Sequence, residues 1–194
     1  MKLTKRSSLA QVALSVGGTL RRHGIRAVLT GGACAAIHSK GAYLSKDVDF
    51  IVAGRVGQNA LDEAMAELGF ERAGSRYTHP LSLFYVEFPP GPLAVGGDFA
   101  IQPIELRAPK GRALALSATD ACRDRLAAFY HWRDRQSLKT AVQIASHGKA
   151  DLARVRKWSE TEGHADDFRE FLAELDKVGA ARPPRKATRR KSSG

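Results

Sequence analysis

The sequence lacks any long apolar run, which bears on where the protein works. No stretch approaches the roughly 18 apolar residues of a membrane span, and residues 1–10 lack the apolar run of a secretory signal. We therefore expect a cytoplasmic protein with no membrane partner. Only two cysteines are present, Cys34 and Cys122, and neither has the spacing to histidine or to another cysteine that a zinc site requires. Each is expected to pack as a small apolar residue in a reducing compartment.

Acidic residues are few relative to basic ones. The chain has 194 residues, of which 43% are apolar, so it is long enough for one packed domain or two small ones. It contains 31 Lys and Arg against 20 Asp and Glu, for a formal net charge of +11. Residues 181–194 hold six of the basic residues and no acid, which leaves 25 against 20, or +5, for residues 1–180. A partner with a phosphate backbone is compatible with this excess but not required by it.

Hydrophobic periodicity predicts two structured regions and a tail. Residues 1–112 are predicted to form a mixed core in the order α-β-α-β-α-β-β-β, and residues 113–178 a helical lobe. The core segments are expected at residues 7–23, 25–29, 33–39, 47–52, 56–68, 70–77, 81–88 and 102–107. The lobe helices are expected at 117–132 (with Ser117 or Thr119 as the cap), 136–147, 151–161 and 165–177, with Trp132 and Trp158 packed inside. Residues 179–194 combine Pro, Gly, Ser and basic residues without periodicity, which predicts a disordered basic tail.

Two aspartates on one predicted strand are the first candidates for chemistry. Asp47 and Asp49 are two residues apart, so their side chains point to the same face of the strand. Like charges at this spacing repel, and the apolar neighbours predict a largely buried strand, so a cation or a proton must relieve the repulsion. Mg²⁺ held jointly by carboxylates and substrate phosphates meets this need. The alternative is an exposed edge strand, on which the pair is only a solvated acidic face.

A pair of glycines supplies the second half of the predicted site. Gly31 and Gly32 follow the predicted strand at 25–29 and precede the predicted helix at 33–39. A turn without side chains lets backbone N–H groups approach an anion, and the helix dipole adds attraction for negative charge. We therefore expect a phosphate to bind beside the metal. Taken alone, two adjacent glycines indicate only a turn.

A third carboxylate is expected to complete or orient the metal site. Glu87 is the leading candidate because it is isolated among apolar residues in the predicted strand at 81–88. Asp98, in a glycine-rich loop, and Glu105, in a later strand, rank below it. The ordinary alternative for a single acid in a strand is a salt bridge.

Together these residues resemble the polymerase-β-like nucleotidyltransferase superfamily. The sequence LSKDVDF at residues 44–50 is similar to the Ser/Thr-Lys-Asp-hydrophobic-Asp motif of AbiEii-like nucleotidyltransferases, which include toxins of toxin–antitoxin and phage-defence systems. DRLAA at residues 124–128 is similar to an Asp-Lys-Leu-Ala-Ala segment of those proteins, and RD at 133–134 to their later Arg-Asp or Lys-Asp element. The resemblance spans about residues 25–145 in four separated pieces.

The resemblance implies an α+β fold, with a nucleotidyltransferase-type mixed sheet, flanking helices and a C-terminal helical lobe. The implied activity is transfer of a nucleoside monophosphate from an NTP to an acceptor, with two Mg²⁺ ions. Arg125 replaces a Lys common in the family; it can neutralise phosphate but is a poorer proton donor. The resemblance assigns metal binding and catalysis to Asp47, Asp49 and Glu87. It assigns nucleotide binding to Thr30, Gly31, Gly32, Ser45 and Lys46. It places two further catalytic residues across the cleft, Arg125 and Asp134, with Asp134 orienting Arg125.

The acceptor stays open at this stage. The basic chain favours RNA, particularly a tRNA end, and the resemblance implies an antitoxin protein as a partner. A small molecule such as an aminoglycoside antibiotic and a protein hydroxyl are alternative acceptors. The contrasting hypothesis is a catalytically inactive module of the same fold that binds nucleotide, nucleic acid or a partner protein.

Overall fold

The computed structural model describes residues 3–109 and 111–180 and places its strands in one mixed sheet. The strands are β1 Ala27–Leu29, β2 Asp47–Val52, β3 Glu71–Ala73, β4 Arg76–Thr78, β5 Tyr85–Glu87, β6 Ile104–Ala108 and β7 Gly111–Ala115. The helices are α1 Leu9–Arg22, α2 Gly31–His38, α3 Gln58–Ala66, α4 Ala118–Trp132, α5 Arg135–Ser146, α6 Leu152–Thr161 and α7 Ala165–Ala180.

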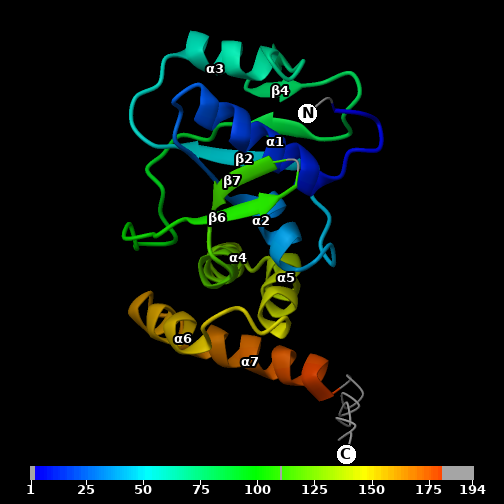
Figure 1. Cartoon of the computed structure of the whole chain (residues 1–194). Coiled ribbons are helices and arrows are strands. Elements are labelled where there is room, and N and C mark those ends of the chain that lie inside the picture. The colour runs from blue at the N-terminus through cyan, green and yellow to red at the C-terminus, as the bar shows by residue number, and fades with distance from the viewer. Residues whose placement is uncertain (1–2, 110, 181–194) are drawn as a thin grey trace, which may run out of the picture.

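The sheet has seven strands in the order β3-β4-β5-β2-β1-β7-β6 within the described residues. The pairs β2–β5 and β1–β7 are parallel, whereas the other neighbouring pairs are antiparallel. Helix α1 packs against β7 and β1, and α2 packs against β2 on one side and α4 on the other. Figure 1 shows α2 between the sheet and the lobe formed by α4 to α7. The predicted α+β class is confirmed.

Several predicted elements begin and end close to where the sequence places them. β2 covers residues 47–52 as predicted, and its alternation buries Val48 and Phe50 completely. Ser117 caps α4, since its hydroxyl accepts a hydrogen bond from the Asp120 N–H at 3.1 Å. Asp151 caps α6 in the same way, accepting from the N–H groups of the first helical turn. Local capping chemistry therefore sets the helix starts in the lobe.

Three predictions about strands need correction. The predicted strand at 70–77 is a hairpin of two short strands, because the chain turns at Gly74, which has a φ of +67°. The predicted strand at 81–88 is reduced to β5, since Ser82 forms a turn with its N–H bonded to the His79 carbonyl at 3.0 Å. β7 was not predicted at all, and it lies across residue 112, where the sequence predicts the core to end.

Glycines let α1 lie directly on β7. A Cβ at Gly17 would come 2.4 Å from the Ala113 Cβ, and one at Gly111 would come 2.9 Å from the Leu14 backbone. Only hydrogen at these two positions permits so close an approach of helix and strand. Gly18 differs, because a Cβ there would lie 3.5 Å from the nearest atom, the Arg112 carbonyl oxygen.

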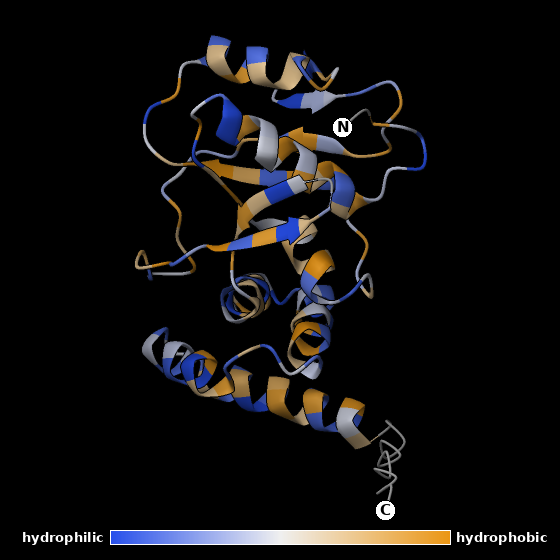
Figure 2. Cartoon of the chain, viewed as in Figure 1, coloured by the Kyte–Doolittle hydropathy of each residue, from blue (hydrophilic) through white to orange (hydrophobic). Residues whose placement is uncertain are grey.

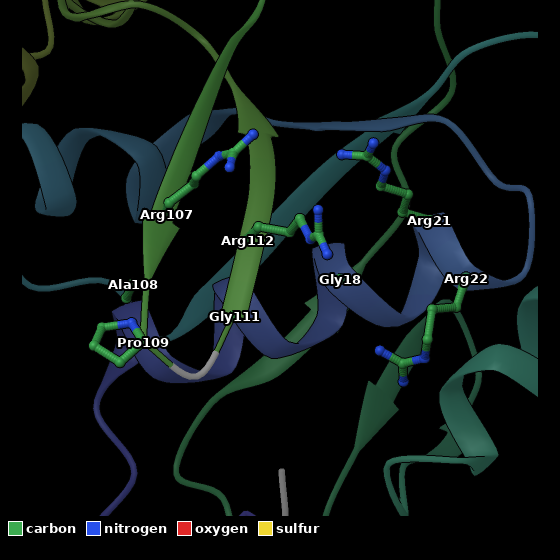
Figure 3. Close-up of a pocket in the computed structure, with 8 residues that line it drawn as sticks. All are labelled: Gly18, Arg21, Arg22, Arg107, Ala108, Pro109, Gly111 and Arg112. Carbon is green, nitrogen blue, oxygen red and sulfur yellow. The ribbon is translucent and has the colours of Figure 1, made fainter.

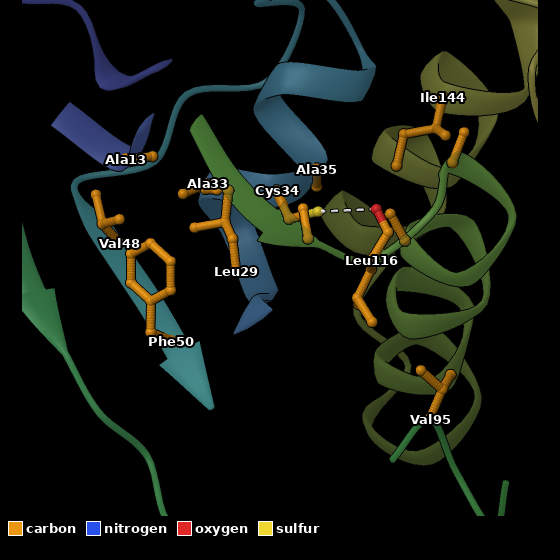
Figure 4. Packing of buried hydrophobic residues seen from close by; sticks show 14 of the residues in the cluster. Ala13, Leu29, Ala33, Cys34, Ala35, Val48, Phe50, Val95, Leu116 and Ile144 are labelled. Carbon is orange, nitrogen blue, oxygen red and sulfur yellow. Dashed lines mark hydrogen bonds between the residues drawn. The ribbon is translucent and has the colours of Figure 1, made fainter. Parts of the chain in front are cut away.

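The core continues from the sheet into the helical lobe. In Figure 4, Leu29, Val48 and Phe50 pack on the sheet side, and the Cys34 thiol donates to the Leu116 carbonyl at 3.7 Å. Both cysteines are buried, as predicted. Figure 2 shows apolar and polar residues alternating along α7, whose phenylalanines face the core.

The two tryptophans have different environments. Trp158 is buried, as predicted, and its ring stacks on Tyr130. The prediction for Trp132 was wrong, because its side chain is 78% exposed. It is the last residue of α4, and the chain then turns away through Arg133 at a φ of +54°.

The end of the described chain extends past the predicted start of the tail. α7 runs to Ala180, so residues 179–180 are helical, and residues 181–194 of the predicted tail lie outside the described residues. Within residues 3–109 and 111–180, no helix combines the length and apolar character that crossing a bilayer requires.

Candidate active site

Three carboxylates meet where β2 and β5 run side by side. The parallel register pairs Asp49 with Glu87 and Asp47 with Tyr85, so all three acids project from the same small area of the sheet. One oxygen from each of Asp47, Asp49 and Glu87 lies within 4.8 Å of the other two. The structure thus brings together the three residues that the sequence proposed for a metal site.

The surroundings of β2 explain why the two aspartates face this way. β2 lies between β5 and β1 in the sheet, so it is not an exposed edge strand. Val48 and Phe50 fill the core on the opposite face, and a one-residue shift of register would bury both aspartates there instead. The alternation of the sequence therefore fixes the acids on the half-buried face.

The cluster is short of positive charge. The pKa of the Asp49 carboxyl is raised from 3.8 to about 7, chiefly by burial and then by the charges of Asp47 and Glu87, while Arg125 acts in the opposite direction. A set of carboxylate oxygens, half buried and mutually repelling, is the donor chemistry that Mg²⁺ prefers. These residues therefore fit a divalent cation.

The glycine turn touches the carboxylates. Gly31 has a φ of +60°, and a Cβ there would lie 2.4 Å from Asp49 Oδ2; one on Gly32 would lie 2.4 Å from the Ser45 hydroxyl oxygen. The Thr30 N–H donates to the Asp49 carbonyl at 2.9 Å, which fixes the turn to β2. Helix α2 begins at Gly31, so the predicted helix start at residue 33 was too late. The first N–H groups of α2 consequently lie beside the cluster.

The segment before β2 positions one ligand and presents a cation. The Ser45 hydroxyl, which is buried, donates a hydrogen bond to Asp47 Oδ1. Lys46 is exposed, and its carbonyl accepts a hydrogen bond from the Tyr85 N–H at 3.1 Å. Ser45 therefore orients Asp47, whereas the Lys46 side chain is free to extend into solvent.

The lobe contributes Arg125 from α4. Its guanidinium donates to Asp124 Oδ2 at 2.7 Å. Burial lowers the Arg125 pKa, but Asp124, followed by Tyr43 and Asp134, more than offsets this and raises it. Asp134 was expected to orient Arg125, but its carboxylate instead caps α5, accepting from the Gln136 N–H at 2.9 Å and the Ser137 hydroxyl at 2.6 Å. Asp124 holds the arginine.

Sequence reasoning missed Arg76 on β4. Its Nε lies 2.8 Å from Glu87 Oε1, and its guanidinium carbon lies 4.5 Å from the centre of the Tyr85 ring. The contact follows from the pairing of Arg76 with Glu87 across β4 and β5. No local signal could have found it, because the pairing depends on how the hairpin docks on β5.

The two lower-ranked acids lie elsewhere. Asp98 pairs with Arg123 at 2.5 Å, which ties the loop before β6 to the lobe. Glu105 pairs with Arg21 at 2.7 Å and also with Arg107. Neither belongs to the carboxylate cluster.

Comparison with known proteins identifies the architecture. A solved structure, an antigenic nucleotidyltransferase-like protein from Paracoccidioides brasiliensis, matches with a TM-score of 0.57 and 16% identity, over 92% of this chain and 91% of that one. The chain has a nucleotidyltransferase-like fold. The antibiotic-resistance factor ANT(2'')-Ia also matches, with a TM-score of 0.47 and 13% identity over 87% of this chain and 95% of that one. No family model and no curated protein matches the sequence.

Proposed function

We propose that the protein is a Mg²⁺-dependent nucleotidyltransferase that moves a nucleoside monophosphate from an NTP to an acceptor hydroxyl and releases pyrophosphate. The observation that carries the proposal is the contact between the carboxylate cluster and the Gly31–Gly32 turn. Hard oxygen donors for a divalent ion and a bare helix start for phosphate meet at one point. The nucleotidyltransferase-like fold supports the same reading.

Each side chain of the site has a separate role in this proposal. Asp47, Asp49 and Glu87 would hold Mg²⁺, two ions in the complete site, which when bound neutralises the phosphates and lowers the pKa of the acceptor hydroxyl. Arg125 neutralises phosphate from the lobe. The acceptor oxygen bonds to the α-phosphorus while the bond to the pyrophosphate oxygen breaks, and the acceptor proton passes to a site carboxylate.

RNA is the acceptor in this proposal. The +5 charge of residues 1–180 supports a polyanionic acceptor over a small neutral one. We include in this proposal an AbiEii-like toxin role and an antitoxin partner, which the motif at residues 44–50 supports. We also include a cytoplasmic location, which the lack of long apolar runs supports. Co-purification with the product of a neighbouring gene would test the partner.

The contact of Arg76 with Glu87 favours a second candidate, a catalytically inactive binding module. A cation already paired with Glu87 competes with Mg²⁺ for that ligand. If Arg76 blocks the site, the wild-type protein will not consume NTP in Mg²⁺, and Arg76→Gln will gain Mg²⁺ binding. If the site is active, the wild-type protein turns over.

Incubation with each of four α-³²P-labelled NTPs, Mg²⁺ and total RNA tests the proposal. Label in the RNA band is expected for wild type, and none for Asp49→Ala. Asp176→Ala, an exposed acid on α7, serves as the matched control and should retain full transfer. Label on the protein instead would identify a protein acceptor, and turnover by Asp49→Ala with an unchanged circular dichroism spectrum would refute the assignment of the site.

A further inference from the structure

Two adjoining hollows lie where α1 meets β6 and β7. Their volumes are about 540 Å³ and about 510 Å³, and both are lined by Arg21 and Arg112. Arg22 and Arg107 line the first hollow, and Arg26 lines the second. We refer to these five arginines together as the arginine groove. All five are exposed.

Negative charge in the groove is insufficient to balance the arginines. Glu105 pairs with Arg21 at 2.7 Å and with Arg107, and Glu67 outside it pairs with Arg22. Among the described residues, five cations therefore meet two carboxylates, an excess of three positive charges. Within the described residues, Arg26 and Arg112 form no ion pair. Water screens exposed pairs such as these, so a phosphate can replace the carboxylate at little cost.

Three of the five guanidinium groups point toward a common space. In Figure 3 the side chains of Arg21, Arg107 and Arg112 extend toward the space between them. Hydrogen bonding by Arg107, aided by the charges of Arg21 and Arg112, lowers the pKa of the Glu105 carboxyl, so all three cations act on one acid. An anion in this space would therefore meet several guanidinium groups at once.

The packing of α1 on β7 builds the groove. Gly17 and Gly111 permit the close approach described above, and the next turn of α1 then carries Arg21 and Arg22 past Arg112. Gly18 and Gly111 line the first hollow, so part of its floor is bare backbone. Gly17 weakens α1 locally, but the packing of α1 on β7 requires it.

The shape and lining favour a chain of phosphates. One phosphate group needs one or two cations, whereas this groove offers five along two connected hollows. Planar guanidinium groups bind phosphate oxygens in pairs. In the part of the chain that the structure describes, no aromatic side chain lines either hollow, so the surface suits the backbone of a nucleic acid and not its bases.

We propose that the arginine groove binds the phosphate backbone of RNA and holds it as the acceptor for the carboxylate site. The identification of this RNA as the acceptor rests on the proposed function; the binding itself does not. The groove lies on β6, β7 and α1, whereas the carboxylates lie on β2 and β5 beyond β1. A bound strand would thus be anchored away from the acidic cluster that repels it.

Binding of a labelled oligouridylate, followed by fluorescence anisotropy without NTP or Mg²⁺, tests the groove. For single strands the slope of log K against log salt is about −0.7 per phosphate neutralised. Arg107→Gln/Arg112→Gln should therefore reduce the slope by about 1.4 and weaken binding by about 25-fold near 0.1 M salt. Arg169→Gln/Lys177→Gln removes the same charge from exposed positions on α7 and should change the slope by less than half as much.

The outcomes separate this inference from the proposed function. Three results would overturn the inference. The two double variants could lose RNA affinity equally, or the groove variant could keep the wild-type salt slope with native circular dichroism. Polyglutamate could also compete as strongly as unlabelled RNA. If the groove variant binds RNA normally while Asp49→Ala stops transfer, the groove proposal fails and the proposed function stands. If RNA binding depends on the groove but no nucleotide transfer occurs, the groove proposal stands and the proposed function fails.

Discussion

Asp49→Asn should stabilise the metal-free protein, because the change removes a carboxylate that two others repel. The pKa of Asp49 is raised from 3.8 to about 7, by burial first and then by Asp47 and Glu87. One unit corresponds to about 1.4 kcal/mol, so the shift sets an upper limit of about 4 kcal/mol. Since the site is only half buried, solvent screening reduces this to about 2 kcal/mol. For a chain of this size the melting temperature should rise by about 4–8 °C.

The stabilisation by Asp49→Asn should depend on pH. The folded protein binds the Asp49 proton more tightly than the unfolded chain, so ionisation destabilises the fold as the pH rises above 3.8 and is complete above about 7. The difference in melting temperature between Asp49→Asn and wild type should therefore grow from pH 4 to 7 and stay constant above pH 8.

Thermal unfolding in EDTA and in Mg²⁺ measures the gain in melting temperature and its dependence on pH. In EDTA at pH 8 the variant should melt above wild type, and Mg²⁺ should stabilise wild type alone and close the gap. Asp176→Asn, on the exposed face of α7, should match wild type in both buffers. If the difference is absent or independent of pH, Asp49 is not a carboxylate destabilised by its neighbours. If Mg²⁺ stabilises Asp49→Asn as much as wild type, Asp49 is not a metal ligand.

Two glycine pairs provide matched predictions. Gly17→Ala should destabilise the protein by about 1–3 kcal/mol through a clash with β7. Gly18→Ala has room for a methyl group and should stabilise α1 by about 0.5–1 kcal/mol. Urea unfolding measures both free energies, and equal effects of the two variants would contradict the packing of α1. Gly31→Ala should lose about 1–2 kcal/mol to its positive φ and also lose Mg²⁺ stabilisation, because the methyl group would meet Asp49. Gly54→Ala, at a φ of +82° with nothing within 4 Å, should lose only stability; retained Mg²⁺ stabilisation in both variants would contradict the role of the turn.

Local patterns were enough to predict β2 and the acids on it. Alternation over residues 47–52 places Asp47 and Asp49 on one face whatever strands lie beside them. Glu87 was identifiable because a lone acid in an apolar strand needs a partner. The structure supplies two kinds of neighbour, the aspartates and Arg76, and no pattern around Glu87 distinguishes between them.

Features that depend on distant pairing were not predictable in this way. β7 is a short Gly-Arg-Ala-Leu-Ala run without β-branched residues, and it becomes a strand because β1 and β6 pair with it on both sides. The hairpin β3–β4 has only three residues in each strand, too few for a periodic signal. The arginine groove arises from residues about 90 positions apart, between α1 and β6–β7, so only the fold brings them together.

Isothermal titration calorimetry measures whether the carboxylate cluster and the glycine turn together bind Mg²⁺ and NTP. Wild-type protein should bind at least one NTP in Mg²⁺ and none in EDTA, because the three carboxylates would repel the triphosphate without a cation. Asp49→Asn, which is expected to fold at least as well, should show no Mg²⁺-dependent heat. Failure of folded wild-type protein to bind any of the four NTPs in Mg²⁺, or equal binding by Asp49→Asn, would show that the carboxylate cluster is not a nucleotide site.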